Sequence, residues 1–376
     1  MRLSSSQNLN KNYKKMSQSI NNTFSKTGKL IFGILLVVLC FLGIVAFASN
    51  SEESKSELNV KEMIFSHIGD AYNWHITTIG KEHISIPLPC IVIGQNGLDI
   101  FCSSKLGHEG HFTEYKGYKI AEEGSNAGKI VEVSTGERPI DISITKNVVS
   151  LLISCALLLI IFLSIAKKYK KNGFCKPTGL QAILEPLIVS LHDDIIKPSI
   201  GKNYKKFTWY LLTVFFFIFI NNLLGIIPIF PGGANLTGNI AITFVLAALT
   251  FLLTNLFGTK GYWKEIFNPD VPIGLKCPLP IMQFIEFLGI FTKPIALCIR
   301  LFANMFAGHV MVLVLIGLIF VFSQLNVIAG LGFSFVSVLL VVFMSLLECL
   351  VCFIQAYVFM TLSALFIGMA QVEEHE

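Results

Sequence analysis

The sequence predicts an all-α polytopic membrane protein with an N-terminal signal or anchor and a small extracytoplasmic region. Of its 376 residues, 53% are hydrophobic and only 14% are charged, a balance that excludes an ordinary soluble domain. Apolar runs long enough to cross a bilayer recur after residue 147. The formal net charge of +5 does not indicate a nucleic-acid-binding protein, because the lysines cluster beside apolar runs, where they determine orientation.

Residues 1–48 are predicted to be a signal peptide or an N-terminal anchor. A polar segment with five lysines precedes an apolar run from Leu30 to Ala48, which ends in Ala46-Phe47-Ala48. A basic segment, an apolar segment and an A-x-A site are typical of a secretory signal. We expect cleavage after Ala48 rather than retention, although the run is long enough to serve as an anchor. Translation from Met16 would leave a conventional basic segment.

Residues 49–146 are predicted to form an extracytoplasmic region with short strands, such as His83–Ile86 and Ile130–Val133. His108 and His111 are not spaced as in the HExxH motif, so we expect solvated loop histidines and no metal site. No cofactor is expected. Cys90 and Cys102 would be able to form a disulfide in an oxidising compartment, and the sequence leaves open whether they do.

The first clear span is Val148–Ala166, which Lys167-Lys168-Tyr169-Lys170-Lys171 follows at once. By the positive-inside rule this end of the span is cytoplasmic, so residues 49–146 lie outside the cytoplasm. Residues 177–206 show apolar side chains at three- and four-residue steps, which predicts a helix on the cytoplasmic surface. Asp193-Asp194 is expected on a solvated turn there, because adjacent helical residues do not face each other as a metal or acid–base pair would.

Two further spans are predicted at Phe207–Phe230 and from Asn235 to about Phe257. The loop between them carries no charge, which is typical of the outer side, and lysines and prolines after residue 259 mark the return to the cytoplasm. The following apolar stretch, Ile281–Ala370, is about 90 residues long. Two helices of that size would each measure ~60 Å, twice the ~30 Å hydrocarbon core. The sequence alone does not decide between two tilted helices and three or four upright spans.

Polar residues within this stretch form a stripe. Glu286, Lys293 and Arg300 recur every seven residues and share one helix face, which Asn304 continues. His309 points to the opposite side. Small residues that permit close helix approach lie on or near the stripe: Ala296, Ala303 and Ala307.

A second polar stripe, with Glu348, Cys352 and Gln355, follows on the next helical segment. A purely structural interpretation pairs Arg300 with Glu286 or Glu348, and lets His309 cap a carbonyl group. Proton transfer accounts better for two stripes, because imidazole and buried carboxyl groups titrate near neutrality. Arg cannot pass a proton on, so we expect it to hold a carboxylate from a partner. Lys293 is a secondary candidate, since its side chain is also able to snorkel to the interface.

The residues of the first stripe belong to a recognisable motif. Arg300-Leu-Phe-Ala-Asn304-Met-Phe-Ala-Gly308, with Lys293-Pro294 before it and Gln355-Ala-Tyr-Val-Phe-Met360 after it, resembles subunit a of the bacterial F-type (rotary) ATP synthase membrane sector. The resemblance covers residues 147–376, and the Pro-Gly-Gly-Ala-Asn-Leu-Thr-Gly-Asn run at 231–239 fits it as well.

The resemblance implies about five transmembrane helices, the last two long and steeply tilted. It implies a non-catalytic, proton-conducting stator subunit of the cell inner (plasma) membrane, with a cytoplasmic C-terminus. The implied partners are membrane lipid, the c-ring, the b-subunit peripheral stalk and the rest of the ATP synthase. ATP synthesis takes place elsewhere in that complex.

The same resemblance implies roles for single residues. Arg300 would face the c-ring carboxylate and separate two offset half-channels, of which Glu286 lines the one to the cytoplasm. His309 and Glu348 stand where the best-known bacterial pattern has Glu and His, which would preserve one acid and one imidazole. The half-channel to the outer side would be lined by Asn304, His309, Glu348 and Gln355.

Two other classes of protein fit the sequence less well. A secondary transporter would need internal repeats or paired broken helices. An intramembrane hydrolase would need a nucleophile with a base, or a metal cluster, within its spans. The sequence shows neither pattern. It does not reveal whether the coupling ion is a proton or sodium, nor the role of residues 49–146.

Overall fold

The computed structural model describes residues 69–79, 82–95, 97–108, 111–121, 126–173, 178–227, 232–267, 281–325 and 327–371. The predicted signal or anchor at 1–48 lies outside these residues. The chain divides into two compact units, Leu58–Ile76 with Ser85–Glu376 and Met1–Glu57 with Thr77–Ile84. All candidate site residues belong to the first unit.

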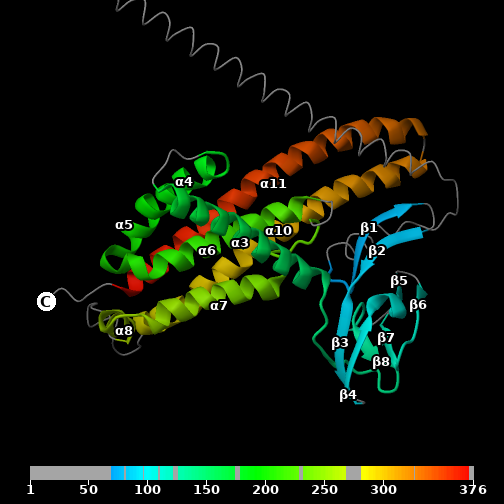
Figure 1. Ribbon diagram of the computed structural model, residues 1–376, viewed down its shortest axis with the longest axis horizontal. Helices are drawn as coiled ribbons and strands as arrows, with labels where there is room; N and C mark the ends of the chain where they lie inside the picture. Colours follow the sequence, from blue (N-terminus) through cyan, green and yellow to red (C-terminus); the bar gives the residue numbers. More distant parts are fainter. Residues whose placement is uncertain are drawn as a thin grey trace, which may run out of the picture. The chain divides into compact units, whose positions relative to one another are not determined.

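Long apolar helices dominate this unit (Figure 1). They are α3 (Lys146–Asn172), α6 (Tyr204–Ile226), α7 (Ile240–Leu256), α10 (Ile281–Leu325) and α11 (Val327–Ala370). By length and composition, the described residues contain four candidate membrane spans, or five if α7 and the short α8 (Lys260–Phe267), which meet at a bend of 99°, form one broken span. The structure therefore agrees with the prediction of a polytopic membrane protein.

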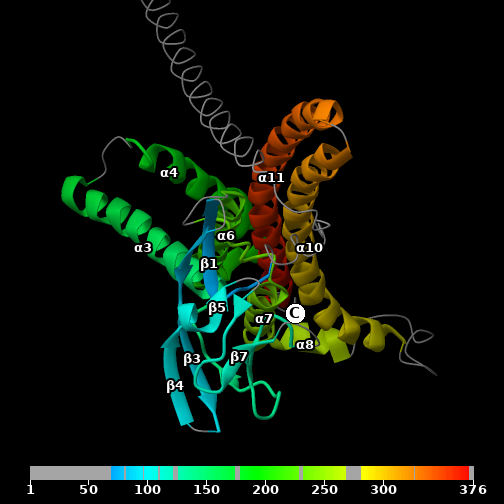
Figure 2. The same ribbon diagram turned by 90° about the vertical axis from the view of Figure 1, so that its right-hand side faces the viewer.

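The last two helices are continuous, with 45 residues in α10 and 44 in α11. They run side by side in both views (Figures 1 and 2). At 1.5 Å per residue each measures roughly 66 Å, about twice the hydrocarbon core. Of the two arrangements that the sequence left open, the structure has the two long helices and not three or four short spans.

The main hydrophobic core lies where α6, α10 and α11 meet. The segment predicted as a surface helix contributes to it through α4 (Gln181–Ser190), a π-helical stretch (Leu191–Ile196) and α5 (Lys197–Ile200). The prediction of a solvated turn at Asp193 and Asp194 is wrong in one respect. Both carboxylates are exposed, but they belong to the π-helical stretch and bond only to nearby side chains.

The region before α3 is built of strands, so the all-α prediction holds only for the membrane helices. Its described residues form four small sheets, with the strand orders β1-β2, β4-β3-β9, β5-β6 and β7-β8. The pairings of β3 with β4 and β9, of β5 with β6 and of β7 with β8 are antiparallel. The two strands expected from the sequence correspond to β2 and β8. The strands are β1 (Asn73–Ile79), β2 (Glu82–Pro87), β3 (Pro89–Gly94), β4 (Gly97–Cys102), β5 (Gly107–His108), β6 (His111–Phe112), β7 (Tyr118–Ile120), β8 (Ile130–Glu132) and β9 (Ile140–Asp141).

The two cysteines of this region are not joined. Cys90 lies opposite Phe101 in the β3–β4 ladder, whereas Cys102 lies opposite Pro89, so the two side chains point to opposite faces of the sheet. Burial raises the pKa of the Cys90 thiol to about 12, which makes it a poor nucleophile. Among the described residues no three His, Cys, Asp or Glu side chains come together as a metal site.

Candidate functional site

Helix α10 has a buried face and an exposed face. Leu297, Leu301 and Met305 are at most 2% exposed and pack into the main core. Arg300 and Asn304 lie on the exposed side, together with the small residues that the sequence placed there: Ala296, Ala303 and Ala307. A guanidinium group thus stands on a surface of alanines, where another helix is able to approach closely.

No ion pair joins Arg300 to any residue that the structure describes. Both carboxylates that the structural interpretation offered, Glu286 and Glu348, are described and do not pair with it. A charge within an apolar helix is costly in a bilayer without a counter-ion or water. The geometry therefore favours a carboxylate supplied by another chain.

The polar stripe on α11 is buried, in contrast to the exposed stripe on α10. Glu348 and Gln355 are each 8% exposed, and Cys352 is fully buried between them. The Glu348 carboxylate packs on Gly308 of α10, where a Cβ atom would lie 3.1 Å from Oε1. Since His309 follows Gly308, the structure brings Glu348 to the level of His309, which is half-buried.

Three contacts establish the antiparallel register of α10 and α11. Ser337 donates a hydrogen bond from Oγ to the Leu315 carbonyl, at 2.5 Å. Glu348 meets Gly308 in the middle, and Lys293 Nζ lies 5.9 Å from the centre of the Phe366 ring at the other end. Interpolation between the last two contacts places Gln355 near the level of Phe302, within one helical turn of Arg300.

The predicted residues therefore divide along the helix pair into two groups, one on each side of Arg300. Asn304, His309 and Glu348 lie toward the C-terminal half of α10, with His309 about 13 Å along the axis. Glu286 lies about 21 Å away in the opposite direction. The structure does not bring Glu286 to the other acidic residue, Glu348.

A small cavity lies on the Glu286 side of Arg300. It has about 20 Å³ of space for the centre of a water molecule, which is about what one water needs. Lys293 contributes to its wall, and so do polar side chains of α7 and α8, among which Tyr262 donates a hydrogen bond to Asn255 Oδ1 at 3.2 Å. Its other polar lining residues are Thr250 and Thr254.

The structure adds polar residues that the sequence analysis did not select. Asn235 Nδ2 donates to the carbonyl of Met305, next to Asn304, at 3.2 Å. Thr237 Oγ1 donates to Asn222 Oδ1 at 2.6 Å, and both residues are fully buried. The sequence signal was present, since paired asparagines near the end of an apolar span are unusual. The contact of Asn235 with α10 was not predictable from spacing.

A chain of hydroxyl groups crosses the core beside the small cavity. Tyr210 OH lies 2.9 Å from Thr250 Oγ1, which lies 3.3 Å from Ser363 Oγ. The chain joins α6, α7 and α11, and its middle residue, Thr250, lines the cavity. Single hydroxyl residues in apolar helices are too common for the sequence to reveal such a chain.

Comparison with known proteins gives the family to which the chain is similar. The model of the family described as ATP synthase A chain matches residues 148–368, and a family described as a domain of unknown function matches residues 63–149. The chain is similar to proteins named ATP synthase subunit a. The one from Pelodictyon phaeoclathratiforme is 44% identical over 249 residues, 63% of this chain and 69% of the relative.

Two further relatives with the same name show how widely the similarity extends. The protein of Chloroherpeton thalassium is 43% identical over 237 residues, which cover 62% of this chain and 68% of the relative. The protein of Myxococcus xanthus is 42% identical over 243 residues, which cover 63% of this chain and 75% of the relative.

Proposed function

This chain belongs to the ATP synthase A chain family, and we propose that it is the proton-conducting stator subunit of an F-type ATP synthase. As a member of the family it is a component of the membrane sector, associates with the rest of the ATP synthase, and takes part in ion transport and ATP synthesis. The proposal concerns how its residues move the ion.

Protons enter from the outer side through His309 and Glu348. The packing of the Glu348 carboxylate on Gly308, beside His309, supports this step because it brings an acid and an imidazole to one level. Asn304 and Gln355 orient water between this pair and Arg300. The proton then neutralises a carboxylate of the c-ring, which is able to turn into lipid once it is uncharged.

Arg300 holds the deprotonated ring carboxylate between the two half-channels. Its exposure among alanines supports this role, since the ring must approach α10 closely. Because a guanidinium group keeps its charge and offers no acceptor, it interrupts any direct proton wire along α10. The ion therefore has to travel with the ring.

Release to the cytoplasm takes place past Glu286 after the ring has rotated. The small water-sized cavity lined by Lys293 supports an exit on this side, and Lys293 takes a secondary role there. In this orientation the C-terminus is cytoplasmic and residues 49–146 are extracytoplasmic. The c-ring and the b-subunit peripheral stalk are the proposed neighbours.

The observation that carries the proposal is the exposed Arg300, which pairs with no described residue. The test is ATP-driven acidification of inverted membrane vesicles that carry Arg300→Ala. We expect pumping to be lost while the complex remains assembled. Lys170→Ala is the matched control, because it removes an exposed cation at the end of α3 and should leave pumping unchanged.

Unchanged pumping by an assembled Arg300→Ala complex would overturn the proposal. Loss of assembly would be separated from loss of conduction by co-purification of the catalytic head. Arg300→Lys refines the result, since a lysine retains the charge without the planar fork. We expect its pumping to fall between those of the wild type and Arg300→Ala.

A further inference from the structure

We propose that one face of the β4-β3-β9 sheet lies on the lipid bilayer, at the surface where α3 enters it. The inference concerns the region before the matched ATP synthase domain. It requires only that α3 crosses the membrane, and it is independent of the proton pathway. We call this surface the aliphatic face, formed by Ile91, Ile93, Leu98, Ile100, Ile140 and Ile142.

The strand register places these six side chains together. Ile93 lies opposite Leu98 on one side and Ile140 on the other, and Ile91 lies opposite Ile100. Residues at alternate positions of a strand share a face, so Ile142 joins Ile140. All six are Ile or Leu, and five are well exposed: Ile93 (38%), Leu98 (62%), Ile100 (61%), Ile140 (65%) and Ile142 (58%).

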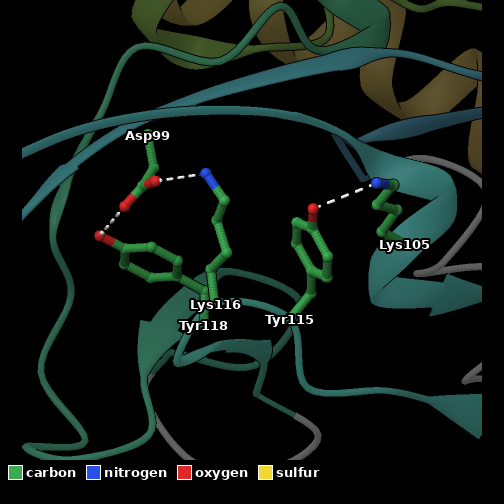
Figure 3. A network of polar contacts seen from close by, with 5 residues as sticks. All are labelled: Asp99, Lys105, Tyr115, Lys116 and Tyr118. Atoms are coloured by element: carbon green, nitrogen blue, oxygen red, sulfur yellow. Dashed lines mark hydrogen bonds and ion pairs between the residues drawn. The ribbon is translucent and has the colours of Figure 1, made fainter.

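The opposite face of the same sheet packs on the core of the region. Cys90, Val92 and Phe101 are buried there in the core of the region. Asp99, which lies between Leu98 and Ile100, accepts hydrogen bonds from Lys116 at 2.7 Å and from Tyr118 at 3.4 Å (Figure 3). One face of the sheet is thus packed against the core and makes polar contacts, whereas the other exposes aliphatic side chains.

No loop separates this sheet from the membrane span. The Ile142 and Ile144 amides donate to Ile91 and Pro89, so the ladder continues to the residue before Thr145. Thr145 is the N-cap of α3, and the amide of its first residue, Lys146, bonds to the carbonyl of Ala71. The backbone is therefore hydrogen-bonded up to the start of the helix, to β3 through Ile142 and Ile144 and to the segment before β1 through Lys146.

The length of α3 places this junction in the headgroup layer. Val148–Ala166 measures roughly 28 Å, about the hydrocarbon thickness. Ile144 then lies within about 10 Å of the hydrocarbon boundary. Ile142 of the aliphatic face lies only four residues before Lys146, the first residue of α3. The side chains of α3 are themselves exposed as a lipid-facing surface, Leu152 at 58% and Ile160 at 65%.

The chemistry of the face favours lipid over a protein partner. Protein interfaces are enriched in Tyr, Trp and Arg, and this face contains none of them. Contiguous apolar patches of this kind mark membrane or protein contact sites rather than free surface. Unbranched acyl chains need no specific hydrogen bonds, and the aliphatic face offers no side-chain donor or acceptor.

The test uses the whole ATP synthase complex in nanodiscs of phosphatidylcholine, a fraction of which carries a photoactivatable diazirine on its acyl chain. After illumination, adducts are mapped on peptides. We expect adducts on Leu98 and Ile100 of the β3–β4 hairpin, as on lipid-facing Leu152. Lys119, an exposed residue of β7 outside the aliphatic face, is the matched control and should remain unlabelled.

Hydroxyl-radical footprinting of the same nanodiscs gives the second measurement. Lipid contact predicts protection of Leu98 and Ile100 together with the lipid adducts. Full oxidation of both residues without adducts would mean that the face is open to solvent, which overturns the proposal. Protection without adducts would mean that protein covers it, which also overturns it. The double variant Leu98→Gln and Ile100→Gln should lose the hairpin adducts and keep those on Leu152.

Discussion

Helices α10 and α11 are nearly equal in length and lie side by side, yet their polar residues point in different directions. Arg300 and Asn304 of α10 stand on an exposed face of alanines. Glu348 and Gln355 of α11 are each only 8% exposed, and Glu348 packs on Gly308 of α10. Both stripes repeat at seven-residue spacing, so spacing alone does not distinguish them.

The difference separates two kinds of function. A polar group that faces outward from an apolar helix is stabilised only by a partner, so we expect the stripe of α10 to contact another chain. A carboxylate enclosed by two helices is able to exchange protons only along a path within this chain. Variants that change the residues of one stripe at a time therefore test whether the stripe of α10 contacts another chain and that of α11 transfers protons.

Beyond Arg300 itself, we expect the largest effect from the pair His309 and Glu348. His309→Ala and Glu348→Ala should each lower ATP-driven pumping in inverted vesicles by at least ~10-fold, because a positioned proton-transfer group typically contributes ~10²–10⁴-fold. The double exchange His309→Glu with Glu348→His keeps one acid and one imidazole at one level. It should pump faster than either single exchange; equal or slower pumping would contradict a relay between the two.

The exposed face of α10 should be next in sensitivity. Ala307→Phe places a large ring where a partner helix must approach, so pumping should fall several-fold without a change in the thermal stability of the subunit. Cys349→Phe makes the corresponding change on the exposed side of α11 and is the control. If the two variants pump equally well, the exposed face of α10 is not the contact surface.

The buried side of α10 is fixed by the loop that carries Asn235. Thr237→Val removes the hydroxyl that donates to buried Asn222 and leaves an unpaired oxygen, at a cost of ~1–3 kcal/mol. We expect a lower midpoint of thermal unfolding for the solubilised complex. Thr213→Val is the control, since this exposed hydroxyl bonds only within its own helix. Equal midpoints would show that the Asn222 contact contributes little.

The smallest expected effect concerns two glycines of α10. Gly308→Ala brings a Cβ to 3.1 Å from Glu348 Oε1, whereas nothing lies within 4 Å of a Cβ at Gly289. Gly289→Ala should stabilise the helix by ~0.5–1 kcal/mol. Gly308→Ala should gain less stability than Gly289→Ala. It should also shift the pH dependence of pumping, because the added Cβ displaces the Glu348 carboxylate. An unshifted pH profile would argue against proton transfer through Glu348.

Local sequence patterns predicted much of this site. The phase of Glu286, Lys293, Arg300 and Asn304 follows from the helical repeat, and the lengths of apolar runs located the spans. The inward direction of Glu348 and the contact of Asn235 with Met305 depend on how distant helices pack, which a single sequence does not encode in its spacing.

The same limit applies to the region before α3. The sequence indicated short strands at His83–Ile86 and Ile130–Val133, but no local pattern gave the order β4-β3-β9. The alternation of side chains along Gly97–Cys102 predicts at most that one face of this strand is apolar. Which face receives the core depends on the hairpin that brings Lys116 and Tyr118 to Asp99.

The C-terminal end of α11 is fastened on three sides. At Gly368 the helix touches α5 so closely that a Cβ would lie 1.9 Å from the Ser199 carbonyl oxygen. Asn203 donates to Gln371 Oε1 at 3.0 Å, and the Thr259 amide donates to the Ala370 carbonyl at 2.9 Å. In mechanical terms α11 is a beam clamped at one end. Under the proposed function a turning ring pushes sideways on α10, and this clamp would carry the reaction torque into the rest of the stator.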